Sequence, residues 1–422
     1  MKRSILVLSL LLALSLTACS KNEPNETKSS VETTSPGETF IDKTDKEYTS
    51  PETTDAPVPE TNPEDANIGN PDYSSDYTEG LAFELTNEGY EYSVSGYTGT
   101  SAEVVIPRIY KGYPVTSIEN FAFKDNTVLT GVTIPDSVTS IGYSAFYNCT
   151  ALTELTIPDS VTFVGIYAFS RCPALSSIEI PGGVKSLGAC AFKECSSLTN
   201  VTVQSGVTYI PSSAFKDCTA LTNITIPDTV TSIGDAAFSG CASLTGISIP
   251  NGISYIGYMT FYGCSALTGI TIPESVTYID DYAFQNCTAL TGITVPGNVK
   301  TIGYAAFSGC TALKNATLTN GLASIDKFVF YNCTALTGIT VPDSVIYINS
   351  SAFQNCTALT SVNLPIQTTA LREFTFSGCS ALTSIYFDGS KIQWDMINKE
   401  KDWNKASGNY TVYCTDGNIR KN

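Results

Sequence analysis

The residues of this 422-residue chain that are most able to take part in chemistry are its 14 cysteines. A thiol can act as a nucleophile, bind a metal ion or pair in a disulfide bond. The chain has no histidine, which excludes a Ser-His-Asp triad, a Cys-His dyad and any metal site with a histidine ligand. An even number of cysteines in a secreted protein would suggest a disulfide framework. The spacing of the cysteines indicates whether they act as nucleophiles, metal ligands or disulfide partners.

Eleven of the cysteines recur at a constant step of 23 residues, and a phenylalanine series from Phe123 to Phe376 keeps the same step. Stacked coils would hold equivalent side chains parallel, with Cβ atoms about 4.8 Å apart, which is longer than a disulfide bond prefers. Eleven is also an odd number. We therefore predict a buried ladder of free thiols that pack as small apolar groups. Its members are Cys149, Cys172, Cys195, Cys218, Cys241, Cys264, Cys287, Cys310, Cys333, Cys356 and Cys379. The states of Cys190 and Cys414, outside this ladder, stay open.

The repeated unit reads C-x-x-L-x-x-I-x-I-P-x-x-V-x-x-I-G-x-x-A-F-x-x, and residues 264–286 are a close copy. Ile270 and Ile272 alternate as in a strand, which Pro273 ends because it has no N–H group. The Ala-Phe pair at Phe284 predicts a short helical or 3₁₀ turn. Gly or Asn precedes the cysteine in eight of the eleven copies. Those residues tolerate the left-handed conformation that ends such a turn.

The L-x-x-I-x-I segment is the strand element of leucine-rich repeats. Over about residues 80–415 the repeat resembles the BspA-like leucine-rich repeat of bacterial cell-surface lipoproteins. This resemblance implies a repeat solenoid of parallel β-strands with short helical or 3₁₀ turns. We expect twelve coils of 23 residues, since one coil cannot bury its apolar face alone. Members of the family are surface adhesins or cell-surface proteins without an assigned role. They share no catalytic residues, and their ligands differ.

The flanks of the repeat predict two caps for the open ends of the stack. Apolar residues alternate on both sides of Asn87-Glu88-Gly89, which predicts a β-hairpin. Trp394 and Trp403 break the repeat near the other end and resemble the C-terminal cap of the family. We therefore predict an N-terminal β-hairpin cap over residues 79–115, the solenoid over 116–387, and a C-terminal cap and tail over 388–422.

The first 19 residues are typical of a signal peptide, with Lys2 and Arg3 before a short apolar run. The run ends in Leu16-Thr17-Ala18-Cys19, which resembles a bacterial lipobox. That resemblance implies cleavage before Cys19 and a diacylglycerol group on its thiol. The alternative is an ordinary cleavage site followed by a chance cysteine. Residues 20–78 hold 14 acidic residues against 4 lysines, with many Thr and Pro, and predict a disordered tether. We expect an extracytoplasmic protein, lipid-anchored to the bacterial cell membrane and exposed at the cell surface.

The net charge of the chain limits the kinds of molecule that it could bind. The formal net charge is −17, and the tether carries 4 − 14 = −10 of it. A nucleic-acid partner is not expected, because phosphate binding needs a basic surface. The sequence has no regular series of acidic residues for Ca²⁺ and no P-loop or dinucleotide fingerprint. We expect the protein to bind no metal and no cofactor. We also expect it to be a monomer.

Two surface features could bind a partner. Outward strand positions such as Thr268 and Thr271 form a threonine series, interpreted as a consequence of the repeat or as a match to an ordered surface such as ice or a polysaccharide. The second feature is a group of tyrosines at turn positions of neighbouring coils, because tyrosine is enriched at protein interfaces. The alternative for this group is an aromatic stack that shields the coil edges. The candidate binding patch consists of Tyr255, Tyr258, Tyr262, Tyr278, Tyr282 and Tyr304.

These features together predict a non-enzymatic lipoprotein that binds a protein or glycan partner, as an adhesion module does. One alternative is a structural lipoprotein of the cell envelope with no host ligand. A more remote alternative is a glycan-acting enzyme that uses paired carboxylates. The adjacent pair Asp280-Asp281 is interpreted as a solvated turn rather than a catalytic pair. No catalytic residue is therefore assigned.

Overall fold

The computed structural model describes residues 77–86 and 89–421. All of these residues belong to one compact unit, Pro63–Asn422. The signal peptide, Cys19 and the predicted tether, apart from its last two residues, lie outside the described residues. The described part is a parallel-strand solenoid of about 14 turns with a spacing of about 23 residues and almost no helix. The predicted fold class is therefore confirmed.

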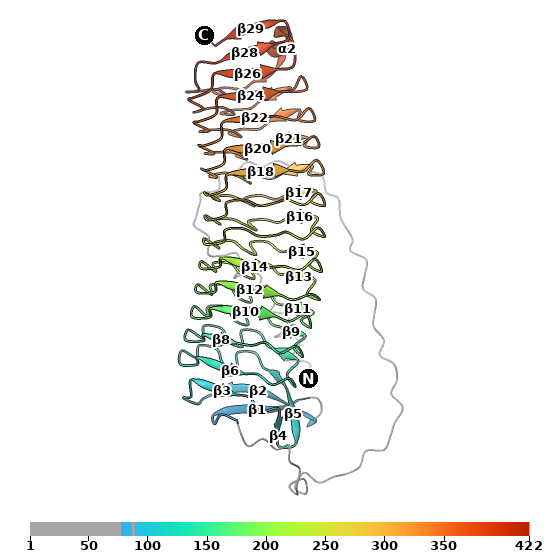
Figure 1. Cartoon of the computed structure of the whole chain (residues 1–422), viewed down its shortest axis with the longest axis vertical. Coiled ribbons are helices and arrows are strands. Elements are labelled where there is room, and N and C mark those ends of the chain that lie inside the picture. Colours follow the sequence, from blue (N-terminus) through green and yellow to red (C-terminus); the bar gives the residue numbers. More distant parts are fainter. Residues whose placement is uncertain (1–76, 87–88, 422) are drawn as a thin grey trace, which may run out of the picture. The chain divides into compact units, whose positions relative to one another are not determined.

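The first column of strands carries the Ile-x-Ile motif of each coil (Figure 1). Equivalent residues of successive coils pair in parallel, as Ser177 does with Asn200. A single bridge, Ser248 with Thr271, continues this column between β14 and β18. The strands are β3 (Glu103–Val105), β6 (Gly131–Thr133), β8 (Glu154–Leu155), β10 (Ser177–Ile180), β12 (Asn200–Val203), β14 (Asn223–Thr225), β18 (Gly292–Val295), β20 (Asn315–Leu318), β22 (Gly338–Thr340), β24 (Ser361–Leu364), β26 (Ser384–Phe387), β28 (Thr411–Cys414) and, antiparallel at the end, β29 (Gly417–Arg420).

The second column consists of two-residue strands whose second residue is buried in all but the last, β27, and is mostly an isoleucine. Tyr255 pairs with Tyr278 here, and Ile256 with Ile279. The strands are β7 (Ser140–Ile141), β9 (Phe163–Val164), β11 (Ser186–Leu187), β13 (Tyr209–Ile210), β15 (Ser232–Ile233), β16 (Tyr255–Ile256), β17 (Tyr278–Ile279), β19 (Thr301–Ile302), β21 (Ser324–Ile325), β23 (Tyr347–Ile348), β25 (Ala370–Leu371) and β27 (Asn398–Lys399).

The third side of each coil is a turn, which we call the turn edge and define as the segments equivalent to residues 280–287. Alternate N–H groups use different acceptors. Those of Tyr282, Phe284 and Asn286 donate to the next coil, at 2.9, 2.8 and 2.8 Å. The intervening N–H groups donate three residues back within the coil, as Cys287 does to Phe284 at 3.2 Å. The bonds are of the 3₁₀ type, but no helix forms, because Tyr282 and Asn286 have positive φ angles of 58° and 61°.

The core is a continuous stack of twelve phenylalanine rings, from Phe123 to Phe376, each fully buried. Neighbouring rings are nearly parallel; Phe284 and Phe307, for example, have centroids 5.1 Å apart and an interplanar angle of 3°. This offset stacking and the loss of apolar surface to water stabilise the coils jointly. No coil can form its core without its neighbours.

Caps close both ends of this stack. At the first end, β1 (Leu81–Thr86) and β2 (Glu91–Tyr97) form the hairpin, and Tyr97 lies against Phe123 with ring centroids 5.8 Å apart. Further along the chain, β4 (Ile109–Tyr110) and β5 (Tyr113–Ile118) form a second small hairpin. At the other end Trp403 covers Phe376 at 6.2 Å, beside the single helix α2 (Lys391–Met396) of the described residues.

Candidate functional site

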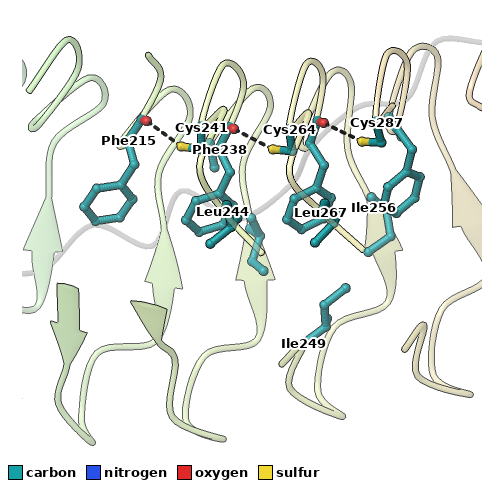
Figure 2. Close-up of a cluster of buried hydrophobic side chains, with 14 of the residues drawn as sticks. Phe215, Phe238, Cys241, Leu244, Ile249, Ile256, Cys264, Leu267 and Cys287 are labelled. Atoms are coloured by element: carbon teal, nitrogen blue, oxygen red, sulfur yellow. Dashed lines mark hydrogen bonds between the residues drawn. The ribbon is translucent and has the colours of Figure 1, made fainter. Parts of the chain in front are cut away.

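The eleven cysteines with the 23-residue step form a fully buried column along the turn edge. Each thiol donates a hydrogen bond to the phenylalanine carbonyl of the preceding coil, as Cys264 does to Phe238 at 3.2 Å (Figure 2). The same carbonyl accepts the N–H of Cys241 in its own coil at 3.1 Å. Cysteine fits here because it is small and apolar and still carries a weak donor.

This environment removes the reactivity that a cysteine could offer. Burial raises the pKa of the Cys264 thiol from 9.0 to about 12, with a smaller opposing effect from its backbone hydrogen bond. The nucleophile and the metal ligand is the thiolate, so these protonated thiols are inert at neutral pH. Each stands as a free cysteine in the structure, and so do buried Cys190 and half-buried Cys414. The redox state of the ladder in the protein stays a prediction, with a test given below.

The adjacent carboxylates Asp280 and Asp281 accept hydrogen bonds at the turn edge. Asp280 accepts the hydroxyl of Tyr278 at 2.9 Å and the N–H of Asp281 at 2.7 Å. Asp281 accepts the N–H of Tyr304 in the next coil at 2.6 Å. No group of three or more Cys, Asp or Glu side chains that could hold a metal ion occurs among the described residues. Nor does this part of the chain contain a helix long and apolar enough to cross a membrane.

The structure divides the six predicted tyrosines between two sides of the coil. Tyr255 and Tyr278 are strand residues of β16 and β17, not turn residues as expected, and they pair in register. Burial, and next the hydrogen bond to Asp280, raises the pKa of Tyr278 to about 12. The other four lie on the turn edge. Tyr262 follows the stacked Phe261 there and is half-buried.

Three of the turn-edge tyrosines form one connected series. The rings of Tyr258 and Tyr282 meet edge to face at 5.8 Å, and those of Tyr282 and Tyr304 at 5.3 Å. The series continues to Phe328 at 5.3 Å and from there to Tyr331 at 5.5 Å. We call these five residues the aromatic zigzag. It links four neighbouring coils, and its four tyrosines are half-buried.

A second group of the same kind lies on the turn edge near the N-terminal cap. Phe121, which is 50% exposed, meets Tyr143 at 5.3 Å, and Tyr143 meets Tyr167 at 6.0 Å. Two cations lie over the ring of the neighbouring Tyr147: Lys124 and Arg171, each 5.8 Å from its centroid. Aromatic rings with cations beside them are typical of protein interfaces.

Phe328, Tyr331 and the whole N-terminal group were not among the predicted binding residues. A signal for them exists in the spacing. Aromatic residues alternate between two adjacent repeat positions, so they are separated by 24 and then 22 residues, as in Tyr258, Tyr282 and Tyr304. Phe121 and Tyr143 are likewise separated by 22 residues. A search for a constant 23-residue step does not find such a series.

The threonine series is tied to the backbone. Thr268 donates to the carbonyl of Thr245 at 3.2 Å, and Thr291 donates to that of Thr268 at 3.2 Å. The hydroxyl groups thus add to the stacking of coils, as the interpretation of a repeat-imposed series expects. The middle residue of the Ile-x-Ile motif, such as Thr271, is exposed on the same face.

Comparisons with known proteins agree with this geometry. The family model described as a BspA type leucine-rich repeat region matches residues 116–244, 208–335 and 300–400. No curated protein matches the chain.

Among solved structures, a leucine-rich repeat protein from Bacteroides ovatus is 27% identical, with a TM-score of 0.59 over 80% of this chain and 99% of that one. A leucine-rich cell-surface protein from Faecalibacterium prausnitzii is 30% identical, with a TM-score of 0.49 over 78% and 99%. The pneumococcal vaccine antigen PcpA, 19% identical with a TM-score of 0.53 over 78% and 97%, shares the fold. With a family model that spans most of the solenoid, the chain belongs to the BspA-type leucine-rich repeat family.

Proposed function

We propose that this protein is a non-enzymatic binding module, held at the cell surface by a lipid on Cys19, that contacts partner molecules through its turn edge. The observation that carries the proposal is the aromatic zigzag of Tyr258, Tyr282, Tyr304, Phe328 and Tyr331. Coil stacking alone does not require these rings, since several other coils have a small residue at the position of Tyr282, as at Ser213, Ala236 and Ser351.

The geometry of the zigzag favours a macromolecular partner. Half-buried tyrosines are held by ring contacts, so little side-chain entropy is lost when a partner covers them. Their hydroxyl groups supply donors and acceptors at the rim. A row of rings across four coils matches an extended protein surface or a glycan better than a small molecule.

Two observations speak against an enzyme. The thiols that could act as nucleophiles are buried and protonated, as shown for Cys264. The adjacent carboxylates Asp280 and Asp281 accept hydrogen bonds that hold their own turn. A role as an envelope scaffold without a ligand is the second candidate, favoured by the regular hydroxyl series such as Thr268 to Thr245.

The binding proposal is tested with the full chain displayed on cells and a panel of purified extracellular matrix proteins and envelope glycans. The variant Tyr258→Ser/Tyr282→Ser/Tyr304→Ser should lose most of the binding that the wild type shows. The matched control is Tyr347→Ser, a 38% exposed tyrosine on β23, away from the turn edge. Equal binding by the wild type and the triple variant would refute the turn-edge site. Binding of no panel member would favour the scaffold.

The anchor is tested separately by metabolic labelling with a radioactive fatty acid. The wild type should take up label and remain with the membrane fraction, because a diacylglycerol group adds about 0.8 kcal/mol of membrane affinity per buried CH₂. Cys19→Ser should remain unlabelled and appear in the soluble fraction. Membrane retention of an unlabelled Cys19→Ser protein would contradict the predicted anchor.

A further inference from the structure

The first column of strands opens between β20 and β22. Residues of β18 and β20 pair along four positions, and those of β22 and β24 along three. Between β20 and β22 the register holds only at Asn315 with Gly338. No further residues of these two strands pair, so the regular pleated face is interrupted here.

The opening coincides with a change in the repeat. Ala316 stands where β18 has Ile293 and β22 has Ile339, both of which are buried in the core. Ala316 is only partly buried. The smaller side chain fills less of the space between coils, which leaves β20 less tightly held to its neighbour. Thr319 replaces the usual strand-ending proline in the same coil.

A groove of about 290 Å³ lies where the strands separate. Its polar side chains are amides and hydroxyl groups, and its lining contains no charged residue. These groups both donate and accept hydrogen bonds. They are Asn315, Thr317, Thr340, Ser361 and Asn363.

An aromatic wall stands beside this groove. Asn363 on β24 pairs in register with Tyr386 on β26, and Tyr386 with Tyr413 on β28. The two tyrosine rings are stacked, with centroids 5.1 Å apart and an interplanar angle of 19°, and they are 44% and 38% exposed. Tyr413 covers one face of the Tyr386 ring, which leaves the other face on the side of Asn363 and the groove.

We propose that this groove binds a neutral glycan, with one sugar ring against the free face of Tyr386 and the sugar hydroxyl groups on Asn315, Ser361 and Asn363. A sugar has an apolar ring face and hydroxyl groups around its edge, which matches an aromatic ring beside amides and hydroxyls. The uncharged lining matches an uncharged ligand, since an ionised one would find no counter-charge there.

A peptide that adds as a strand fits less well. Strand addition needs a free sheet edge with a row of unpaired backbone groups. Here both sides of the opening belong to one continuous stack, and the coils remain joined at Asn315 and Gly338. This site lies on the strand face, separate from the turn edge. It is therefore independent of the binding proposed for the aromatic zigzag.

The test uses the full chain and a panel of neutral tetrasaccharides of glucose, mannose and N-acetylglucosamine, measured by isothermal titration calorimetry. At least one should bind the wild type. Tyr386→Ala and Asn363→Ala should each weaken that binding by tenfold or more. Ala316→Ile should abolish it, because the isoleucine fills the space between coils, while the thermal unfolding temperature stays equal or rises.

Tyr347→Ala is the matched control, since Tyr347 is 38% exposed on the second strand column, and its affinity should equal that of the wild type. Circular dichroism confirms that each variant is folded. The proposal is overturned if no tetrasaccharide binds at millimolar concentration, if Ala316→Ile binds as the wild type does, or if an uncharged peptide competes for the groove. None of these outcomes bears on the turn-edge tyrosines.

Discussion

At the scale of single residues, the cysteine column depends on one acceptor used twice. The carbonyl of Phe238 takes the N–H of Cys241 in its own coil and the S–H of Cys264 in the next. The first coil differs from the others at the cysteine position. It has Asn126 in place of cysteine, and the amide oxygen of Asn126 instead accepts the N–H groups of Val128 and Leu129 at 3.0 and 2.9 Å.

The buried thiols predict a loss of stability at alkaline pH. The thiol pKa of Cys264 is about 12 in the folded protein and 9.0 when it is exposed. Below pH 9 both states keep the proton and stability is full. From pH 9 to 12 only the unfolded state loses it, so each such thiol lowers the free energy of unfolding by about 1.4 kcal/mol per pH unit.

Urea unfolding at pH 8, 9.5 and 10.5 measures this effect. Lysines and tyrosines titrate in the same range, so the wild type is compared with Cys264→Ala. The free energy of unfolding of this variant should fall less steeply with pH, by the contribution of one thiol. Parallel curves for the two proteins would mean that Cys264 is not buried as a neutral thiol.

At the scale of elements, the turn edge is the part that local sequence signals describe least well. The left-handed residue before each cysteine was predictable, because it is mostly Gly or Asn, as at Gly309 and Asn286. The second left-handed residue, four positions earlier, was not. It is never glycine and includes Ala305 with φ 53° and Tyr282 with φ 58°. Hydrogen bonds to the next coil impose this conformation, so it follows from stacking and not from propensity.

This conformation predicts different responses of two adjacent alanines to the same substitution. Ala305→Gly relieves left-handed strain of about 1–2 kcal/mol and loses one methyl worth about 0.8 kcal/mol, so its stability should change by less than about 1 kcal/mol. Ala306 is fully buried and is not among the residues of positive φ. Ala306→Gly should therefore cost about 1–2 kcal/mol. Chemical denaturation compares them, and an equal or larger loss for Ala305→Gly would contradict the strained turn.

At the scale of the whole molecule, the described coils behave as a stack that shares one core and is sealed by caps. The repeat period, the inward residues and the two caps could be predicted from sequence, because they follow from a constant 23-residue step and from the need to cover Phe123 and Phe376. The groove could not be. It lies beside Ala316, where β20 and β22 pair at a single position, and strand pairing appears only when the coils are placed side by side.

Such a stack should tolerate loss of a whole coil but not of part of one. Deletion of residues 264–286 removes 23 residues and joins coils in register, so the product should be a folded monomer of lower stability. Deletion of residues 264–285 removes 22 and shifts every later inward residue by one position. That variant should misfold or aggregate. Size-exclusion chromatography and circular dichroism compare the two, and a similar outcome for both would argue against stacking by register.

We predict that the eleven ladder cysteines are buried, reduced thiols and not a redox, metal or catalytic system. Thiol counting with a colorimetric reagent at pH 8, without prior reduction, tests it most directly. In the native protein the eleven ladder thiols should remain unreactive for hours, because each is fully buried. In denaturant all eleven should react at once. Rapid reaction of ladder thiols in the native protein, or a deficit of reactive thiols after denaturation that reducing agent restores, would contradict the account.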